Sequence, residues 1–209
     1  MEPIDAEKGH IRQGKVNKDM YEVQARVEGI SPLLMNRFAE ETAEEVIKRV
    51  SGKPVQPEIA VSLYILPDGT IYQPATHIEG SFIKAAANFK ITGKGKKTYK
   101  DLAKSSIFVE PDAIAHEIQE YNIDKRPVVN PTTRGRVIRA RPILNQWALR
   151  FRIKVLDDQF PREVVKSILD YAGSSVGIGD YRPRFGRFIV TEFNLVDTEK
   201  ETKGKKSVK

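Results

Sequence analysis

Three arginines, three glycines and three aromatic residues fall between positions 177 and 188. Guanidinium groups form charge-assisted hydrogen bonds with phosphate oxygens, glycines let backbone N–H groups approach an anion, and flat rings stack on bases. This combination predicts a loop that grips single-stranded nucleic acid with little preference for sequence. The residues expected to bind are Gly177, Gly179, Tyr181, Arg182, Arg184, Phe185, Gly186 and Arg187.

The same composition also suits an ordinary connection between two elements. Glycine and proline are common in turns, aromatic residues such as Phe185 and Phe188 can belong to a core, and an arginine cluster can be a solvated surface. Residues 177–188 taken alone leave both interpretations open.

Further arginines could extend the same binding surface. Residues 134–141 are rich in arginine, and the predicted strand at 147–155 alternates apolar side chains with cationic ones. Exposed strand faces are also often rich in Lys and Arg for solubility alone. The residues predicted to extend the groove are Arg134, Arg136, Arg139, Arg141, Arg150 and Arg152.

Charge and composition favour an anionic partner. The 209 residues contain 35 Lys and Arg against 28 Asp and Glu, a formal net charge of +7, and nucleic acid is the commonest partner of such a protein. The absence of cysteine excludes disulfides and thiolate metal sites and fits a cytoplasmic protein. No apolar run is long enough to cross a bilayer, so no membrane partner is expected.

No cofactor and no metal are expected. Walker, Rossmann and zinc-binding patterns are absent from the sequence, and no pair of carboxylates has the spacing of metal ligands. The segment GKGKK at 93–97 lacks the strand and the Ser or Thr of a phosphate-binding P-loop.

Strict alternation of apolar and polar side chains predicts strands at 21–29 and 147–155. The turn sequence Pro67-Asp68-Gly69 predicts a hairpin, because Asp-Gly between β-rich runs favours a tight turn. The remaining extended segments are predicted at 59–66, 70–72, 106–109, 113–121, 128–138 and 187–196.

Apolar residues recurring every three or four positions predict three helices. The first covers residues 40–50. The second begins at Thr76, which is a plausible N-cap, and runs towards Phe89. The third covers residues 161–172, with Gly173 as its C-terminal cap.

Strand, helix, strand hairpin, helix, strand is the order of the ferredoxin-like unit. The predicted fold is therefore α+β, a ferredoxin-like (RRM-like) antiparallel sheet with helices on one face and an elaborated middle. We predict one domain at residues 19–197. The polar, charged segments 1–18 and 198–209 are predicted to be disordered tails, the second of them basic.

Three segments resemble the RAMP superfamily of CRISPR proteins, and the backbone subunits of crRNA effector complexes look most similar. They are the glycine loop after the last predicted helix, the sequence SPLLMNRF at 31–38, and the sequence DGTIYQPATHIEGSFIKAAANF at 68–89. A diverged relative from a phage or another mobile element fits the same motifs.

The resemblance implies binding of RNA or single-stranded DNA, often in filaments, and it implies that the segment at 72–80 opens an RNA-contacting helix. Ala75 and Glu79 stand where that motif usually has a glycine and a basic residue, which leaves Lys84, one turn further on, as the expected cation. The family's final glycine loop is matched by Gly177, Ile178, Gly179, Arg182, Arg184 and Gly186.

RNA-cleaving RAMP enzymes commonly use a histidine, whose pKa lies near neutrality, as general acid or base. His10 lies in a predicted tail and His116 in a polar stretch, so both are predicted to be exposed bystanders. His77 lies at a predicted helix start and is the candidate catalytic residue, with a capping or surface role as the alternative. Some backbone subunits cut RNA with a loop aspartate, which only by position could be Asp101, Asp112 or Asp124.

The sequence predicts a binding protein rather than an enzyme. Its expected partner is single-stranded RNA or DNA, and it is expected to act as a homo-oligomer or as a subunit of a nucleoprotein complex. One alternative is a metal-independent endoribonuclease that uses His77. The other is an assembly protein whose basic loop docks on an acidic surface, such as residues 40–45 of the next copy.

Overall fold

The fold is built on a four-stranded antiparallel sheet. The computed structural model describes residues 20–38, 40–51, 55–129 and 132–196. The sheet has the order β4-β8-β1-β9. Its strands are β1 (Tyr21–Gly29), β4 (Ile107–Glu110), β8 (Ala148–Val155) and β9 (Phe188–Leu195).

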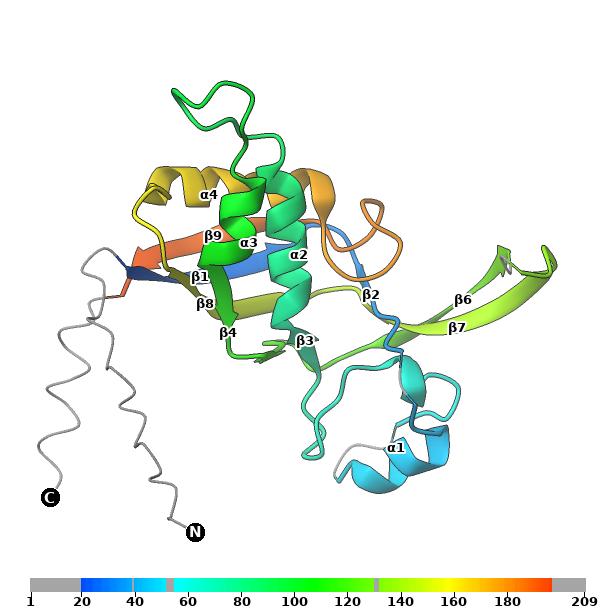
Figure 1. Cartoon of the computed structure of the whole chain (residues 1–209). Helices are drawn as coiled ribbons and strands as arrows, with labels where there is room; N and C mark the ends of the chain where they lie inside the picture. The colour runs from blue at the N-terminus through cyan, green and yellow to red at the C-terminus, as the bar shows by residue number, and fades with distance from the viewer. Residues whose placement is uncertain (1–19, 39, 52–54, 130–131, 197–209) are drawn as a thin grey trace, which may run out of the picture.

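Two longer helices, α2 (Ala75–Ala86) and α4 (Arg162–Tyr171), cover one face of this sheet together with the shorter α3 (Lys100–Ser106) (Figure 1). Helix α2 lies between β1 and β4 in the chain, and α4 connects β8 to β9. Two strand–helix–strand units thus share one sheet, with β1 and β8 at its centre. This arrangement is ferredoxin-like and confirms the α+β prediction.

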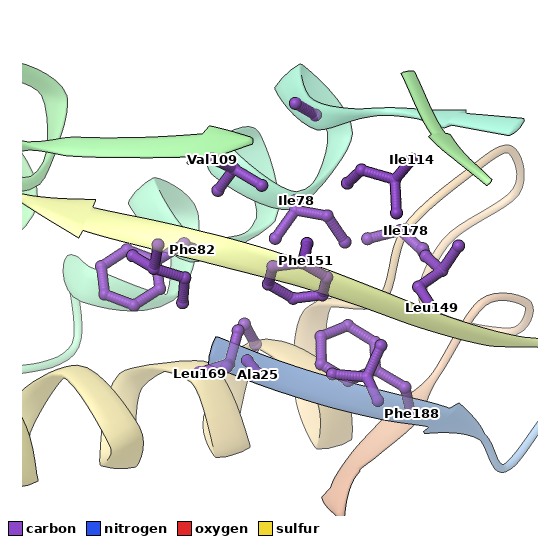
Figure 2. Close-up of a cluster of buried hydrophobic side chains, with 14 of the residues drawn as sticks. Ala25, Ile78, Phe82, Val109, Ile114, Leu149, Phe151, Leu169, Ile178 and Phe188 are labelled. Carbon is purple, nitrogen blue, oxygen red and sulfur yellow. The ribbon is translucent and has the colours of Figure 1, made fainter. Parts of the chain in front are cut away.

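The core lies between the sheet and the helices. The predicted alternation is observed in β1, where Val23, Ala25 and Val27 are fully buried. Figure 2 shows Ala25 with Phe151 of β8, Phe82 of α2 and other apolar side chains. Each fully buried side chain of this kind stabilises the fold by roughly 1.5–3 kcal/mol.

The middle of the chain adds a second, three-stranded sheet of order β2-β7-β6 and a two-stranded pair of β3 with β5. Strands β6 and β7 form a long hairpin that extends away from the main sheet (Figure 1). The added elements are β2 (Leu33–Leu34), α1 (Ala43–Arg49), a 3-10 turn (Ala60–Ser62), β3 (Tyr72–Pro74), β5 (Ala113–Ala115), β6 (Asn122–Val129) and β7 (Arg136–Leu144).

Three predicted strands differ from the observed ones in this middle region, and the strand predicted at 113–121 ends already at Ala115. The predicted strand at 128–138 spans the tip of the β6–β7 hairpin, which carries no Asn-Gly or Asp-Gly turn signal. The predicted hairpin around Pro67-Asp68-Gly69 forms its turn, with Leu66 N donating to Thr70 O at 2.9 Å. Its strands shrink to one bridge between Ile65 and Ile71, because part of the 59–66 segment is 3-10 turn.

Two predicted helix caps are also wrong. Pro74, rather than Thr76, occupies the N-cap position of α2, and Thr76 lies inside the helix. Gly173 does not end α4, since the chain continues through a π-helical turn, Ala172–Val176. Packing explains the glycine at position 173, because a Cβ there would lie 2.3 Å from the carbonyl oxygen of Phe188 in β9. Helix α3 has no counterpart in the prediction.

The predicted tails, residues 1–18 and 198–209, lie outside the described residues. The boundaries of the single predicted domain, residues 19–197, therefore stay a prediction.

Candidate nucleic-acid interface

Backbone hydrogen bonds fix the glycine-arginine loop, residues 177–187, against the body of the protein. Ile178 N donates to Gly186 O at 2.9 Å across the loop, and Asp180 N donates to Leu34 O at 2.8 Å. The Ile178 side chain is fully buried and lies in the hydrophobic cluster of Figure 2. The loop therefore presents its outer side chains from a well-anchored backbone.

The three arginines of this loop, Arg182, Arg184 and Arg187, are exposed. Among the residues that the structure describes, none of them forms an ion pair with a carboxylate. Their charge is therefore not neutralised locally and is available to an anion. Tyr181, beside them, is 58% exposed.

The prediction that Phe185 stacks on a base is wrong, because its ring is buried. Only 7% of its surface is exposed. The guanidinium carbon of Arg126 lies 4.9 Å from the centre of its ring, and the Tyr181 ring lies 6.0 Å away. Phe185 thus supports the loop from within, and the predicted stacking role is corrected to Tyr181 alone.

The loop amides supply fewer donors than predicted. Gly177 N already donates to Ala172 O at 2.8 Å, and Gly186 N donates to Pro32 O at 2.8 Å. The Gly179 amide makes no hydrogen bond within the described part of the chain. Gly179 is therefore the glycine whose N–H could still meet a phosphate oxygen.

A small cavity of about 110 Å³ lies where the loop meets the start of α2. Gln73, whose side chain is fully buried, leaves its Oε1 atom without a hydrogen bond among the described residues. The cavity is thus polar and brings together the two segments that carry the sequence motifs. Its lining residues are Met35, Asn36, Tyr64, Gln73, His77, Gly179 and Asp180.

His77 is half-buried in this cavity and contacts the Gln73 side chain amide through Nδ1. The Tyr64 ring packs edge-on against it, with ring centres 5.4 Å apart. Burial lowers the pKa of His77, and the nearby charge of Arg182 lowers it further. Both effects favour the neutral form of the imidazole, which lies beside the loop.

His116 is not the exposed bystander that the sequence predicts. It is 3% exposed, and neither ring nitrogen has a hydrogen-bond partner among the described residues. Burial lowers its pKa to about 4. Its ring packs against Trp147, so His116 is a neutral core residue, while His10 lies outside the described residues.

Arg141 is not part of an exposed groove. It is 6% exposed, and its Nη1 atom lies 3.2 Å from Oδ2 of Asp180 in the loop. Breaking a buried pair leaves an uncompensated charge, so this contact fixes the loop to β7. Arg141 is therefore a structural residue that positions the candidate site.

The other predicted arginines of this segment lie on the extending hairpin. Arg136 and Arg139 belong to β7, and Arg134 lies in the turn with a φ of 55°. All three are exposed and have no carboxylate partner among the described residues. They form a second group of available cations, separate from those of the loop.

The sheet face opposite the helices is not the cationic surface that the sequence predicts. Arg150 forms a two-bond pair with Glu192, at 2.5 and 2.8 Å, and Arg26 forms one with Glu117, whose shortest contact is 2.7 Å. Hydrogen bonds from Arg26 lower the pKa of Glu117.

Lys154 of the same face pairs with Glu110 at 2.7 Å. Arg152 is exposed and also has an interaction of its own. The partner carboxylates come from two other strands and a loop, and alternation within β8 cannot reveal them. The face is thus largely balanced in charge.

A residue of the motif at the start of α2 has a structural role. Glu79, which replaces a usual basic residue, accepts a hydrogen bond at 2.8 Å from Val109 N of β4. Lys84 is exposed near the other end of α2 and has no ion pair among the described residues. The structure thus assigns Glu79 to the helix–sheet contact and does not bring Lys84 to the cavity.

Asp101 and Asp124, two of the three positional aspartates, have cationic neighbours. Asp101 lies 3.7 Å from Lys104, and Asp124 lies 2.5 Å from Arg126. Within the described ranges, no cluster of three or more histidine, aspartate or glutamate side chains could hold a metal ion. The same residues include no helix with the length and apolar character needed to cross a membrane.

Comparison with known proteins identifies a solved structure of similar fold. No protein-family model matches the sequence, and no curated protein shows significant sequence similarity to it. A chain in the cryo-EM structure of the Type III-B Cmr-beta complex bound to cognate target RNA is similar, with a TM-score of 0.50 and 13% sequence identity. The match covers 85% of this chain and spans 61% of the length of that chain. The likeness shows a shared fold.

Proposed function

We propose that this chain is a RAMP-like protein that binds single-stranded nucleic acid as a subunit of a nucleoprotein assembly. The observation that carries the proposal is the set of three unpaired, exposed arginines on a loop whose backbone is fixed by the core. The fold supports it, because a chain of similar fold belongs to a complex solved with bound RNA.

The loop would hold the sugar–phosphate backbone rather than read bases. Arg182, Arg184 and Arg187 would donate to phosphate oxygens, and the Gly179 amide would add one further donor. Tyr181 would stack on a base, a contact that every base can make. The hairpin arginines Arg134, Arg136 and Arg139 would meet the next stretch of the strand.

Fluorescence anisotropy with labelled single-stranded RNA, single-stranded DNA and duplex DNA, measured over a salt series, tests this proposal. We expect tight binding to single strands that weakens as salt increases, because bound phosphates release counterions. Absence of binding to all three probes would contradict the proposal and favour an assembly role, in which the basic loop meets an acidic protein surface.

The double substitution Arg182→Ala with Arg184→Ala should weaken binding to every single-stranded probe by roughly tenfold or more. Each lost phosphate contact should also reduce the slope of log affinity against log salt by about 0.7, so the double variant should lose about 1.4. Anisotropy titrations at four or more salt concentrations measure both quantities.

A matched control removes two positive charges elsewhere. Lys104 of α3 and Lys166 of α4 are exposed and pair with neighbouring aspartates, at 3.7 and 2.8 Å. Lys104→Ala with Lys166→Ala should leave the affinity close to that of the unmodified protein. Equal losses in both double variants would show that only net charge matters and would remove the loop from the site.

We also propose that the protein binds without cutting. The residues that line the cavity include His77 but no second histidine that could act as the partner acid. Labelled RNA should therefore stay intact on a gel after long incubation, with or without EDTA. Cleavage that persists in EDTA and is lost in His77→Ala would instead establish the endoribonuclease alternative.

A further inference from the structure

Phe38 is the most exposed large hydrophobic side chain among the described residues, at 95% of its surface. It lines a groove of about 410 Å³ between the segment after β2 and residues 138–140 of β7. Ile138 of β7 is 78% exposed and lines the same groove. Two large apolar groups thus remain in water, where neither stabilises the fold by burial.

The backbone that carries Phe38 is held in place. Met35 N donates to Pro142 O of β7 at 3.0 Å, and Arg37 N donates to Ser62 O at 3.0 Å. The Arg37 side chain also pairs with Glu41 at 2.9 Å. The exposed ring therefore projects from an anchored segment.

The residues that line the groove include two arginines and one carboxylate. Glu58, its one acidic lining residue, is already paired with Lys125 at 2.7 Å. Arg139 is exposed and has no carboxylate partner within the described part of the chain. The Nη1 atom of Arg37 is buried without a hydrogen-bond acceptor. A positive charge and an unused donor thus accompany the exposed ring.

The groove and the small cavity beneath the glycine-arginine loop share one lining residue. Asn36 lines both this groove and the small cavity beneath Gly179 and His77. A strand bound at the glycine-arginine loop would therefore pass Asn36 on its way to Phe38.

We propose that Phe38 is a stacking platform for one unpaired base of the bound strand, with Arg139 contacting the adjacent phosphate. The inference rests on the proposed function and adds to it a second base contact, distant in sequence from Tyr181. An exposed aromatic ring beside an unpaired arginine is the combination that single-strand binding surfaces use, because any base can stack on the ring. The groove's apolar wall at Ile138 would cover the other face or edge of that base.

Phe38→Ala should weaken binding of a single-stranded oligonucleotide by roughly tenfold, since stacking on one aromatic ring contributes on the order of 1–3 kcal/mol per base and each 1.4 kcal/mol is tenfold. The salt slope should not change, because the ring carries no charge. Phe38→Trp should bind at least as tightly as the unmodified protein. Phe108→Ala is the control, because Phe108 is 45% exposed on β4 of the main sheet, away from the groove.

Fluorescence of the Phe38→Trp variant gives a direct readout of stacking. The one native tryptophan, Trp147, is 2% exposed and provides a constant background. Addition of an unlabelled single strand should quench the new tryptophan. An oligonucleotide of abasic sites, which has phosphates but no bases, should bind more weakly and quench far less.

The outcomes separate this inference from the function on which it rests. If the unmodified protein binds no single strand, both fail. If it binds, but Phe38→Ala keeps full affinity and the tryptophan is not quenched, the stacking platform is refuted and the loop proposal stands. If Phe38→Ala instead alters only the oligomeric state, measured by light scattering, the groove is a contact between protein copies and the base-stacking proposal is overturned.

Discussion

Replacing Gly186 with alanine is expected to lower the free energy of unfolding by more than about 3 kcal/mol. Gly186 has a φ of 71°, a conformation that L-residues with a side chain rarely adopt. A Cβ at this position would lie 1.8 Å from the Ile178 carbonyl oxygen. That oxygen belongs to backbone anchored by a fully buried side chain, so the clash cannot be relieved by a rotamer change.

Urea or thermal unfolding followed by circular dichroism measures this effect. For a domain of this size, each kcal/mol corresponds to a shift in Tm of about 2–4 °C, so a fall of roughly 10 °C is expected. The variant should also lose nucleic-acid binding, since displacement of the loop would move Arg182 and Arg184.

Gly80→Ala is the matched control. Gly80 lies inside α2, is exposed, and has no atom within 4 Å of the position that a Cβ would take. Alanine is preferred over glycine in a helix by roughly 0.5–1 kcal/mol, so this substitution should raise Tm slightly. A Gly186→Ala protein as stable as the unmodified one would contradict the described loop conformation.

The second large effect is a loss of stability in mild acid that depends on His116. Burial moves the pKa of His116 from 6.5 to about 4 in the folded protein, whereas the unfolded chain keeps the ordinary value. Between these two pH values the unfolded state binds more protons, so stability falls as the pH falls. The full effect is about 3 kcal/mol, of which roughly 2 kcal/mol should appear between pH 7 and pH 5.

Urea titrations of the unmodified protein and His116→Leu at these two pH values test this prediction. Leucine cannot titrate, and it removes two unpaired buried nitrogens, so the variant should lose much less stability on acidification. The carboxylates whose pKa values are lowered by ion pairs or caps, such as Glu117 and Glu45, act only at lower pH. Equal acid sensitivity of the two proteins would show that His116 is not held neutral in the core.

Local sequence patterns predicted the parts of the fold that local periodicity controls. The alternation in β1 and β8 reflects one buried and one open face, so both strands were predicted within one residue of their observed limits. Helix α4 and the loop after it were also recognised, because their apolar stripe and glycines are adjacent in the chain.

Features that depend on distant partners could not be predicted in this way. Arg141 and Phe185 look like exposed ligands in sequence, but they are buried because the loop folds over β7 and Arg126. His116 packs against Trp147, which lies 31 positions further along the chain. Phe38 has no sequence signal that separates it from a core residue, and only its exposure in the structure distinguishes it.

The charge balance on the open sheet face has a consequence for how the protein meets its partner. Arg26, Arg150 and Lys154 are each matched there by glutamates, so that face contributes little long-range field. The arginines of the loop and of the hairpin, in contrast, have no carboxylate partners among the described residues. A diffusing polyanion would therefore be attracted more strongly to those arginines than to the open sheet face, which favours first encounters at the loop and the hairpin.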